Sequence, residues 1–266
     1  MLEKPTIANG LLDSGVDPNA GAHGGRLSKV SSRLERKKRF TSNPLHLACS
    51  RGMATVVRKL LHKGCKPNSP DASGSFPIHL ASSTTTTKAD VGQSRSKNDD
   101  NNNTEALNRE DENRLACVKH LLEAGVPITM KDGNKQTVLH CAARAGHCKV
   151  LKFLLEKWKE GLEKGSIRHV DAKGGEINFD WPDRWFRTPV HWAVLNGKAD
   201  ALEILLEAGC SADPPKPTMR RVNRQTSVAQ ESPVEICERL YPSGVAPTTA
   251  AGAVGCRIRS LLSCRR

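Results

Sequence analysis

A phrase that recurs along the chain constrains its fold more than any other feature. Residues 43–64, NPLHLACSRGMATVVRKLLHKG, are nearly repeated by residues 137–158, TVLHCAARAGHCKVLKFLLEKW, and by residues 188–209, TPVHWAVLNGKADALEILLEAG. A catalytic motif normally occurs once in a chain, whereas a recurring phrase is typical of proteins built from stacked structural units. The repeats therefore limit the possible folds before any local secondary-structure pattern is considered.

The spacing of this phrase indicates the length of one unit. Pro44 and Pro77 occupy the same position in NPLHLA and FPIHLA, 33 residues apart. With this phrase and period, the chain resembles the ankyrin-repeat family, whose units combine a β-turn with two antiparallel helices. The resemblance implies an all-α ankyrin-repeat solenoid of helix-turn-helix units with enlarged finger loops, the fingers being the turns that project from the stack. SPVEIC at residues 232–237 resembles a degenerate fifth copy.

Insertions separate the later repeats. In the second unit the extra residues, at about 84–111, fall between its two helices, and they are polar and low in complexity. Such a segment buries too little apolar area to offset the entropy of ordering it, so we predict one long disordered insertion there. A second insertion, at about 159–180, enlarges a finger.

The predicted organisation has four parts. Residues 1–20 form a partial N-terminal repeat, residues 21–39 a basic finger insertion, residues 40–213 the interrupted ankyrin repeats, and residues 214–266 a basic segment with the degenerate repeat. The first part begins inside a repeat, which is expected of a fragment, an internal start or a damaged first repeat.

The residues that begin each first helix differ between units. Thr188 can accept a hydrogen bond as N-cap, and the proline after it suits the first helical position. Phe76 cannot cap a helix, and Val138 lacks the fixed φ of proline. We therefore predict that the first helices of the second and third units are less well formed.

Charge leaves several interpretations open. The formal net charge is +13, and most of it is concentrated in residues 26–39 and 214–266. The cluster of Arg36, Lys37, Lys38 and Arg39 is a solvated surface, a nuclear-import signal, or a contact for nucleic acid or acidic lipid. Binding of nucleic acid or an anionic surface through these basic segments is the alternative function. Residues 26–39 contain no aromatic residue, and the first one after them is Phe40. The absence of aromatic residues within this segment disfavours the binding of single-stranded nucleic acid.

Histidines and cysteines suggest a metal site only at first sight. His140, Cys141, His147 and Cys148 lie close in sequence, as metal ligands can. The resemblance instead implies that the histidine of each phrase, including His140, hydrogen-bonds between adjacent units. The nine cysteines form no CxxC pair, and we interpret them as reduced thiols. No catalytic triad pattern or phosphate loop is present in the sequence, so we expect no enzyme activity, no cofactor and no metal.

The resemblance implies that a partner protein binds at variable positions of the fingers and of the first-helix ends. In DRWFRT, residues 183–188, these finger positions are Arg184, Trp185 and Arg187, residue types that are enriched at binding hot spots. The positions that close the first helices are Ser50, Arg51, Arg144, Ala145, Leu195 and Asn196. The predicted partner-binding residues are Arg39, Phe40, Arg51, Asn134, Arg144, Arg184, Trp185, Arg187 and Asn196.

Two questions about this finger stay open in the sequence. Trp185 either contacts a partner or packs inward with Trp181 and Phe186 to support the insertion. Phe186 also replaces the usual glycine of the finger, where a positive φ is often needed. The resemblance implies a protein-protein interaction module or adaptor that binds a partner on the concave ankyrin surface and the fingers. We expect it in the cytoplasm or nucleus, with a partner that presents an acidic or aromatic surface. Because no apolar run is long enough for a membrane span, we expect no transmembrane segment.

Overall fold

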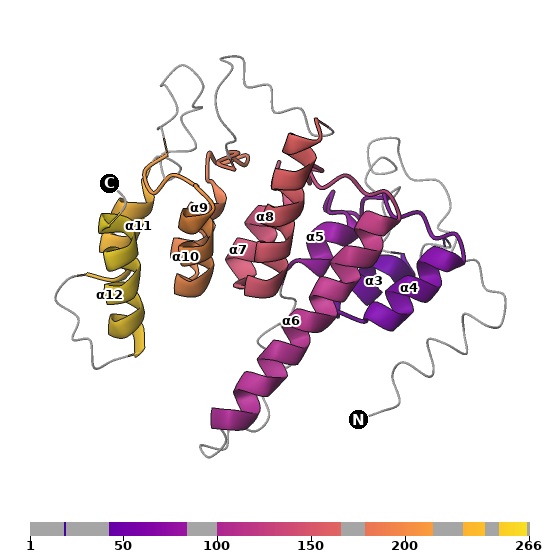
Figure 1. The fold of residues 1–266 in the computed structure, drawn as a ribbon, viewed down its shortest axis with the longest axis horizontal. Coiled ribbons are helices and arrows are strands. Elements are labelled where there is room, and N and C mark those ends of the chain that lie inside the picture. Colours follow the sequence, from indigo (N-terminus) through magenta and orange to yellow (C-terminus); the bar gives the residue numbers. More distant parts are fainter. Residues whose placement is uncertain are drawn as a thin grey trace, which may run out of the picture. The chain divides into compact units, whose positions relative to one another are not determined.

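The computed structural model describes residue 19 and residues 43–83, 100–165, 179–214, 231–242 and 250–264. All regular secondary structure within these ranges is helical (Figure 1). The chain divides into two compact units, residues 1–133 and residues 134–266. The predicted all-α fold is confirmed.

The described residues of the first unit form two helix pairs. They are α3 (Pro44–Ser50) with α4 (Ala54–His62), and α5 (Pro77–Ala81) with α6 (Asp100–Glu123). α3 packs against α5, and α4 packs against α6, so first helices contact first helices and second helices contact second helices. Leu45, Leu60, Ile78 and Leu121 are fully buried between them, as the apolar stripes of amphipathic helices require.

The described residues of the second unit form three further helix pairs of this kind. Its first helices are α7 (Val138–Ala145), α9 (Pro189–Leu195) and α11 (Pro233–Leu240), and its second helices are α8 (Cys148–Glu163), α10 (Ala199–Glu207) and α12 (Ala250–Ser263). α9 contacts both α7 and α11, while α10 contacts both α8 and α12. The segment 232–237 thus supplies the start of a helix that pairs with α12, and Ile236 and Ile258 are buried there.

The first helices begin as their capping residues dictate. Phe76 makes no side-chain cap, and α5 has only five residues, which confirms the weak first helix predicted for the second unit. The same prediction is wrong for the third unit, because α7 has eight residues. There the Nδ1 atom of His140 accepts a hydrogen bond from the N–H group of Thr137 at 3.1 Å. This cap satisfies a backbone donor at the helix start without the help of a proline.

The insertion of the second unit differs from the prediction in its second half. The prediction of a disordered segment over residues 84–111 is wrong for residues 100–111, because α6 begins at Asp100. Residues 84–99 lie outside the described residues. The helix therefore extends well into the polar segment of the insertion.

Arg114, which is only 2% exposed, ties this long helix to the rest of the unit. Its Nη1 group donates to the carbonyl oxygen of Ser83 at 2.6 Å, and its Nη2 group donates to that of Ser50 at 3.3 Å. Its Nε group pairs with the Glu110 carboxylate at 3.0 Å. The guanidinium thus lies where α3 and α5 end, and a positive charge there complements the exposed carbonyl groups of the helix termini.

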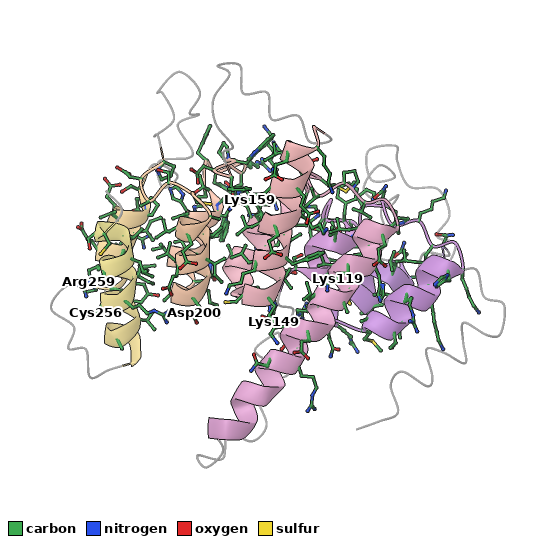
Figure 2. All side chains as sticks on the ribbon, in the orientation of Figure 1. Lys119, Lys149, Lys159, Asp200, Cys256 and Arg259 are labelled. Atoms are coloured by element: carbon green, nitrogen blue, oxygen red, sulfur yellow. The ribbon has the colours of Figure 1, made fainter. Side chains whose placement is uncertain are left out.

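Charged side chains cover the second helices. Lys119 on α6, Lys159 on α8 and Asp200 on α10 are exposed (Figure 2). They form a solvated surface on each unit. None of the described helices combines the length and the apolar character needed to cross a membrane.

Candidate functional site

Three fingers share one backbone conformation. Positive φ angles occur at Gly74 (78°), Lys135 (61°) and Phe186 (61°). Each of these residues follows an aspartate by three positions, namely Asp71, Asp132 and Asp183. The finger of residues 183–188 therefore keeps the family turn, and its phenylalanine adopts the left-handed conformation that glycine usually supplies.

The buried Asp183 carboxylate organises this finger. Its Oδ1 atom accepts hydrogen bonds from the backbone N–H groups of Trp185 at 2.8 Å and Arg187 at 2.9 Å. Its Oδ2 atom accepts from the indole Nε1 group of Trp192 at 3.0 Å and from the Nε2 group of Gln136 at 3.2 Å. With two donors on each oxygen, the carboxylate is well satisfied although it is buried.

Histidines of the first helices hydrogen-bond to the backbone of the segment that begins the following repeat. The carbonyl oxygen of Arg187 lies 3.1 Å from Nε2 of His140 and accepts the N–H group of Asp183 at 2.9 Å. Because Nδ1 of His140 accepts from Thr137, its Nε2 atom carries the proton and donates to Arg187. Nε2 of His79 lies 3.2 Å from the carbonyl oxygen of Met130 in the first unit. These contacts confirm the inter-repeat role implied for His79 and His140.

Two arginines converge on one indole in the second unit. The guanidinium carbon of Arg144, near the end of α7, lies 5.5 Å from the ring centroid of Trp192, and that of Arg187 lies 5.3 Å from it. All three side chains are partly exposed. Both distances are within the range of cation–π attraction. The structure thus brings together two predicted contact residues on a tryptophan that sequence reasoning did not select.

A signal for Trp192 was present in the repeats. Trp192 occupies the same position in TPVHWA that Leu47 occupies in NPLHLA. The side chain of Leu47 is 54% exposed, so this position faces solvent in the first unit as well. A bulky aromatic residue at an exposed repeat position is a stronger sign of binding than one in the core.

The tryptophan that packs inward beneath the insertion is Trp181 and not Trp185. The buried Trp158 ring contacts Phe179 at 6.2 Å and Trp181 at 6.5 Å between centroids. Trp181 therefore supports the enlarged finger, as edge and tilted aromatic contacts can. Trp185 is partly exposed and Arg184 is exposed in the same finger.

The remaining predicted residues are dispersed. Asn196 is exposed and donates through Nδ2 to the carbonyl oxygen of Trp192 at 2.9 Å. The carbonyl oxygen of Asn134 accepts the N–H group of Arg184 at 2.8 Å. Arg51 is exposed in the first unit, where it follows α3. The other predicted residues, Arg36, Lys37, Lys38, Arg39 and Phe40, lie outside the described residues.

Burial changes the ionisation of two groups near the finger. It lowers the pKa of His191 to about 4, and the nearby charge of Arg187 acts in the same direction. It raises the pKa of Asp180 to about 6, although a hydrogen bond from the N–H group of Ser211 opposes the increase. His191 is therefore neutral at pH 7, and Asp180 ionises there against a desolvation cost.

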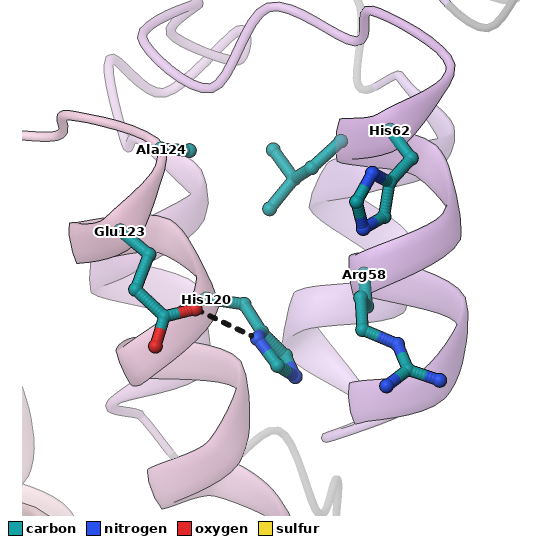
Figure 3. Close-up of a pocket in the computed structure, with 6 residues that line it drawn as sticks. Arg58, His62, His120, Glu123 and Ala124 are labelled. Atoms are coloured by element: carbon teal, nitrogen blue, oxygen red, sulfur yellow. Dashed lines mark hydrogen bonds and ion pairs between the residues drawn. The ribbon is translucent and has the colours of Figure 1, made fainter.

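The first unit has a surface depression of about 220 Å³ between α4 and α6 (Figure 3). Arg58 and His62 line it from α4, and His120 and Glu123 line it from α6. Nδ1 of His120 lies 3.3 Å from the Glu123 carboxylate. Within the described ranges, no group of three or more histidine, cysteine or acidic side chains is arranged to hold a metal ion. Because most of its lining residues are exposed, we assign no chemistry to this depression.

Comparison with known proteins identifies the repeats of this chain. Residues 105–216 match the family described as ankyrin repeats (3 copies), and residues 29–81 match the family described as ankyrin repeats (many copies). The palmitoyltransferase Hip14 of Drosophila melanogaster is 35% identical over 100 residues, which are 38% of this chain and 13% of that protein. Rabankyrin-5 of Mus musculus is 24% identical over 228 residues, 76% of this chain and 16% of that protein.

A relative of more similar length is the probable 26S proteasome regulatory subunit p28 of Saccharomyces cerevisiae. It is 26% identical over 166 residues, which are 62% of this chain and 53% of that protein. The match thus spans about half of this relative and a much smaller share of the other two.

Proposed function

Because the chain belongs to the ankyrin-repeat family, we propose that it is a protein-interaction module whose binding surface includes the finger of residues 183–188 and the neighbouring first helices. Ankyrin repeats generally mediate protein-protein interaction, and their stacked units create extended surfaces for it. The proposed module is an adaptor in the cytoplasm or nucleus that has no catalytic residues of its own.

The observation that carries this proposal is the rigid presentation of large side chains by the finger. Asp183 holds the backbone at both Trp185 and Arg187, while Arg184 and Trp185 extend into partly or fully exposed positions. A preorganised backbone lowers the entropy lost on binding. Tryptophan and arginine are also the residue types most enriched at interface hot spots.

The relatives are compatible with this role. One is named a palmitoyltransferase, but only 13% of that protein is aligned with this chain. Another is named a probable 26S proteasome regulatory subunit. We therefore propose that this chain recognises a protein and does not itself transform a substrate.

A variant of the finger tests the proposal. Binders are first selected from a random-sequence peptide library with the full chain, and the tightest one is titrated against Arg184→Ala/Trp185→Ala. We expect weakening by roughly 2 kcal/mol, about 30-fold, because both side chains are hot-spot types. The melting temperature should stay within a few degrees, since neither side chain is buried.

The matched control is Arg58→Ala/Lys59→Ala, at two exposed positions of α4. It should bind as tightly as the unmodified protein. Unchanged affinity of the finger variant would contradict the assignment of this finger to the interface. A large fall in its melting temperature with unchanged affinity of the folded protein would assign the finger to packing.

A further inference from the structure

We infer that Arg144, Arg187 and Trp192 form a recognition site for the carboxylate side chains of an acidic segment in the partner protein. The inference rests on the proposed function and goes beyond it, because it names the chemistry that the partner must present. It also adds Trp192, which no family pattern pointed to.

The three side chains come from three different segments of the second unit. Arg144 belongs to α7, Arg187 to the finger and Trp192 to α9. Both guanidinium groups lie within cation–π distance of the same indole, at 5.5 Å and 5.3 Å. Stacking orients a guanidinium through its flat face and leaves the N–H groups at its edge available for a planar acceptor.

These two arginines differ from the ion-paired arginines of the chain. Arg114, Arg239 and Arg257 each have a carboxylate within 3.0 Å. Among the described residues, no carboxylate lies within 4.0 Å of the guanidinium of Arg144 or Arg187. Two partly exposed cations without an acidic partner therefore share one small area of the surface.

The nearest candidate for an internal partner is already occupied. Asp183 receives two hydrogen bonds on each carboxylate oxygen, from two backbone groups and from Gln136 and Trp192. A carboxylate has about four acceptor positions, so this one has none left for a guanidinium. An external carboxylate is the group that would complete the charge balance of the site.

The site is also held in place before any ligand binds. The N–H group of Arg187 is bonded to Asp183, and its carbonyl oxygen is bonded to Asp183 and His140. The indole N–H group of Trp192 is bonded to Asp183 as well. Binding then orders mainly the two arginine side chains, which keeps the entropy cost small.

An acidic peptide fits this arrangement better than a nucleic acid does. Forked guanidinium groups match carboxylates and phosphates alike in a bidentate geometry, so the aromatic ring decides between the two kinds of ligand. A single-stranded nucleic acid would need free aromatic rings on which to stack its bases, but two guanidinium groups already lie over the Trp192 ring. The observations therefore favour a protein ligand.

The test uses the full chain and a 12-residue peptide of mixed aspartate and glutamate as the probe. Its affinity is measured with the unmodified protein, with Arg144→Gln/Arg187→Gln, and with the control Lys59→Gln/Lys152→Gln, which removes the same charge from exposed positions of α4 and α8. We expect at least about tenfold weakening in the first variant, equivalent to about 1.4 kcal/mol, and less than twofold in the control. The indole N–H signal of Trp192 in nuclear magnetic resonance spectra, assigned with Trp192→Phe, should shift on binding.

Several results would overturn the inference. They are equal weakening in both double variants, unchanged binding by Arg144→Gln/Arg187→Gln, no binding of the acidic peptide, and tighter binding of a DNA duplex that the same variant abolishes. Circular dichroism of each variant verifies folding, and Arg144→Lys/Arg187→Lys, which keeps the charge without the fork, should show an intermediate loss.

The peptide library separates this inference from the proposed function. If the selected peptides are not acidic but still depend on Arg184 and Trp185, the inference fails and the proposed function stands. If the library yields no binder while the acidic probe also fails to bind, both fail.

Discussion

Two fingers of the molecule, residues 71–76 in the first unit and residues 183–188 in the second, share a backbone conformation. They differ in the side chains that this backbone presents. Asp71 accepts from the N–H groups two and four residues ahead at 2.8 Å and 2.9 Å, and Asp183 does so at the same two distances. The first finger has the sequence DASGSF and the second DRWFRT. The aspartate therefore sets the conformation, and the side chains between its two hydrogen bonds can differ from one finger to the next.

The two aspartates differ in what else they hold. Asp71 also accepts the hydroxyl group of Ser73 at 2.6 Å, within its own finger. Asp183 instead reaches Gln136 in the preceding finger and Trp192 on α9. In the second unit the finger is thus connected to α9, the helix that contributes Trp192 to the proposed recognition site.

Replacing these aspartates should have the largest effect. Asp183→Ala leaves four donors without a partner, and we expect it to lower the free energy of unfolding by about 4 kcal/mol. Asp71→Ala should cost less, about 2 to 3 kcal/mol. All four tryptophans lie in residues 134–266, so urea unfolding followed by tryptophan fluorescence reports on the second unit, and circular dichroism reports on both. Equal costs would show that the contacts with Gln136 and Trp192 add no stability.

A second pair of residues gives a smaller, pH-dependent effect. Oδ2 of Asp180 accepts the N–H group of Ser211 at 2.9 Å, and Oδ1 of Asn19 accepts that of Lys66 at the same distance. In both cases the donor lies two residues beyond the glycine that follows a second helix, Gly209 or Gly64. Asn19 also donates through Nδ2 to the carbonyl oxygen of Gly64 at 3.1 Å. The side-chain amide of Asn19 thus makes the same hydrogen bond in the first unit that the Asp180 carboxyl group makes in the second. An asparagine should therefore fit at position 180.

Asp180→Asn should stabilise the second unit at pH 7 by about 2 kcal/mol, a value reduced for partial exposure. Burial raises the pKa of Asp180 from 3.8 to about 6. Its contribution to stability is therefore fully present below pH 4 and is lost as the pH rises through 6. The gain from the amide should accordingly be small near pH 4. Fluorescence-detected unfolding at both pH values measures it, and an equal gain at the two would refute the role of ionisation.

Backbone strain in the fingers should give the smallest effect. Lys135 is exposed and has a φ of 61°, so Lys135→Gly should raise the free energy of unfolding by about 1 kcal/mol. Phe186→Gly should gain less, because the ring is partly buried. Gly74→Ala should have the opposite sign, since its added Cβ atom would lie 3.0 Å from Cα of Gly133. Thermal unfolding of the three variants tests this order, and a loss of stability in Lys135→Gly would contradict it.

The sequence predicted those features that depend on short stretches of chain. Repeat phrases, capping residues and apolar stripes are local, and so the helix pairs and the inter-repeat histidines could be predicted. The start of α6 could not, because Asp100 and its neighbours are polar and give no amphipathic signal. The cluster of Arg144, Arg187 and Trp192 depends on how α7, the finger and α9 pack, which no spacing in the chain reveals.

Arg114 has a consequence for how the first unit gains its cooperativity. In a repeat stack, stability is approximately the sum of what each repeat contributes and of the interfaces between neighbours. Arg114 donates to Ser83 in its own repeat and to Ser50 in the preceding one, across 31 and 64 residues of chain. One side chain therefore supplies part of an interface energy that is usually spread over many apolar contacts. Loss of this guanidinium would therefore weaken the coupling between the two repeats and make their unfolding less cooperative.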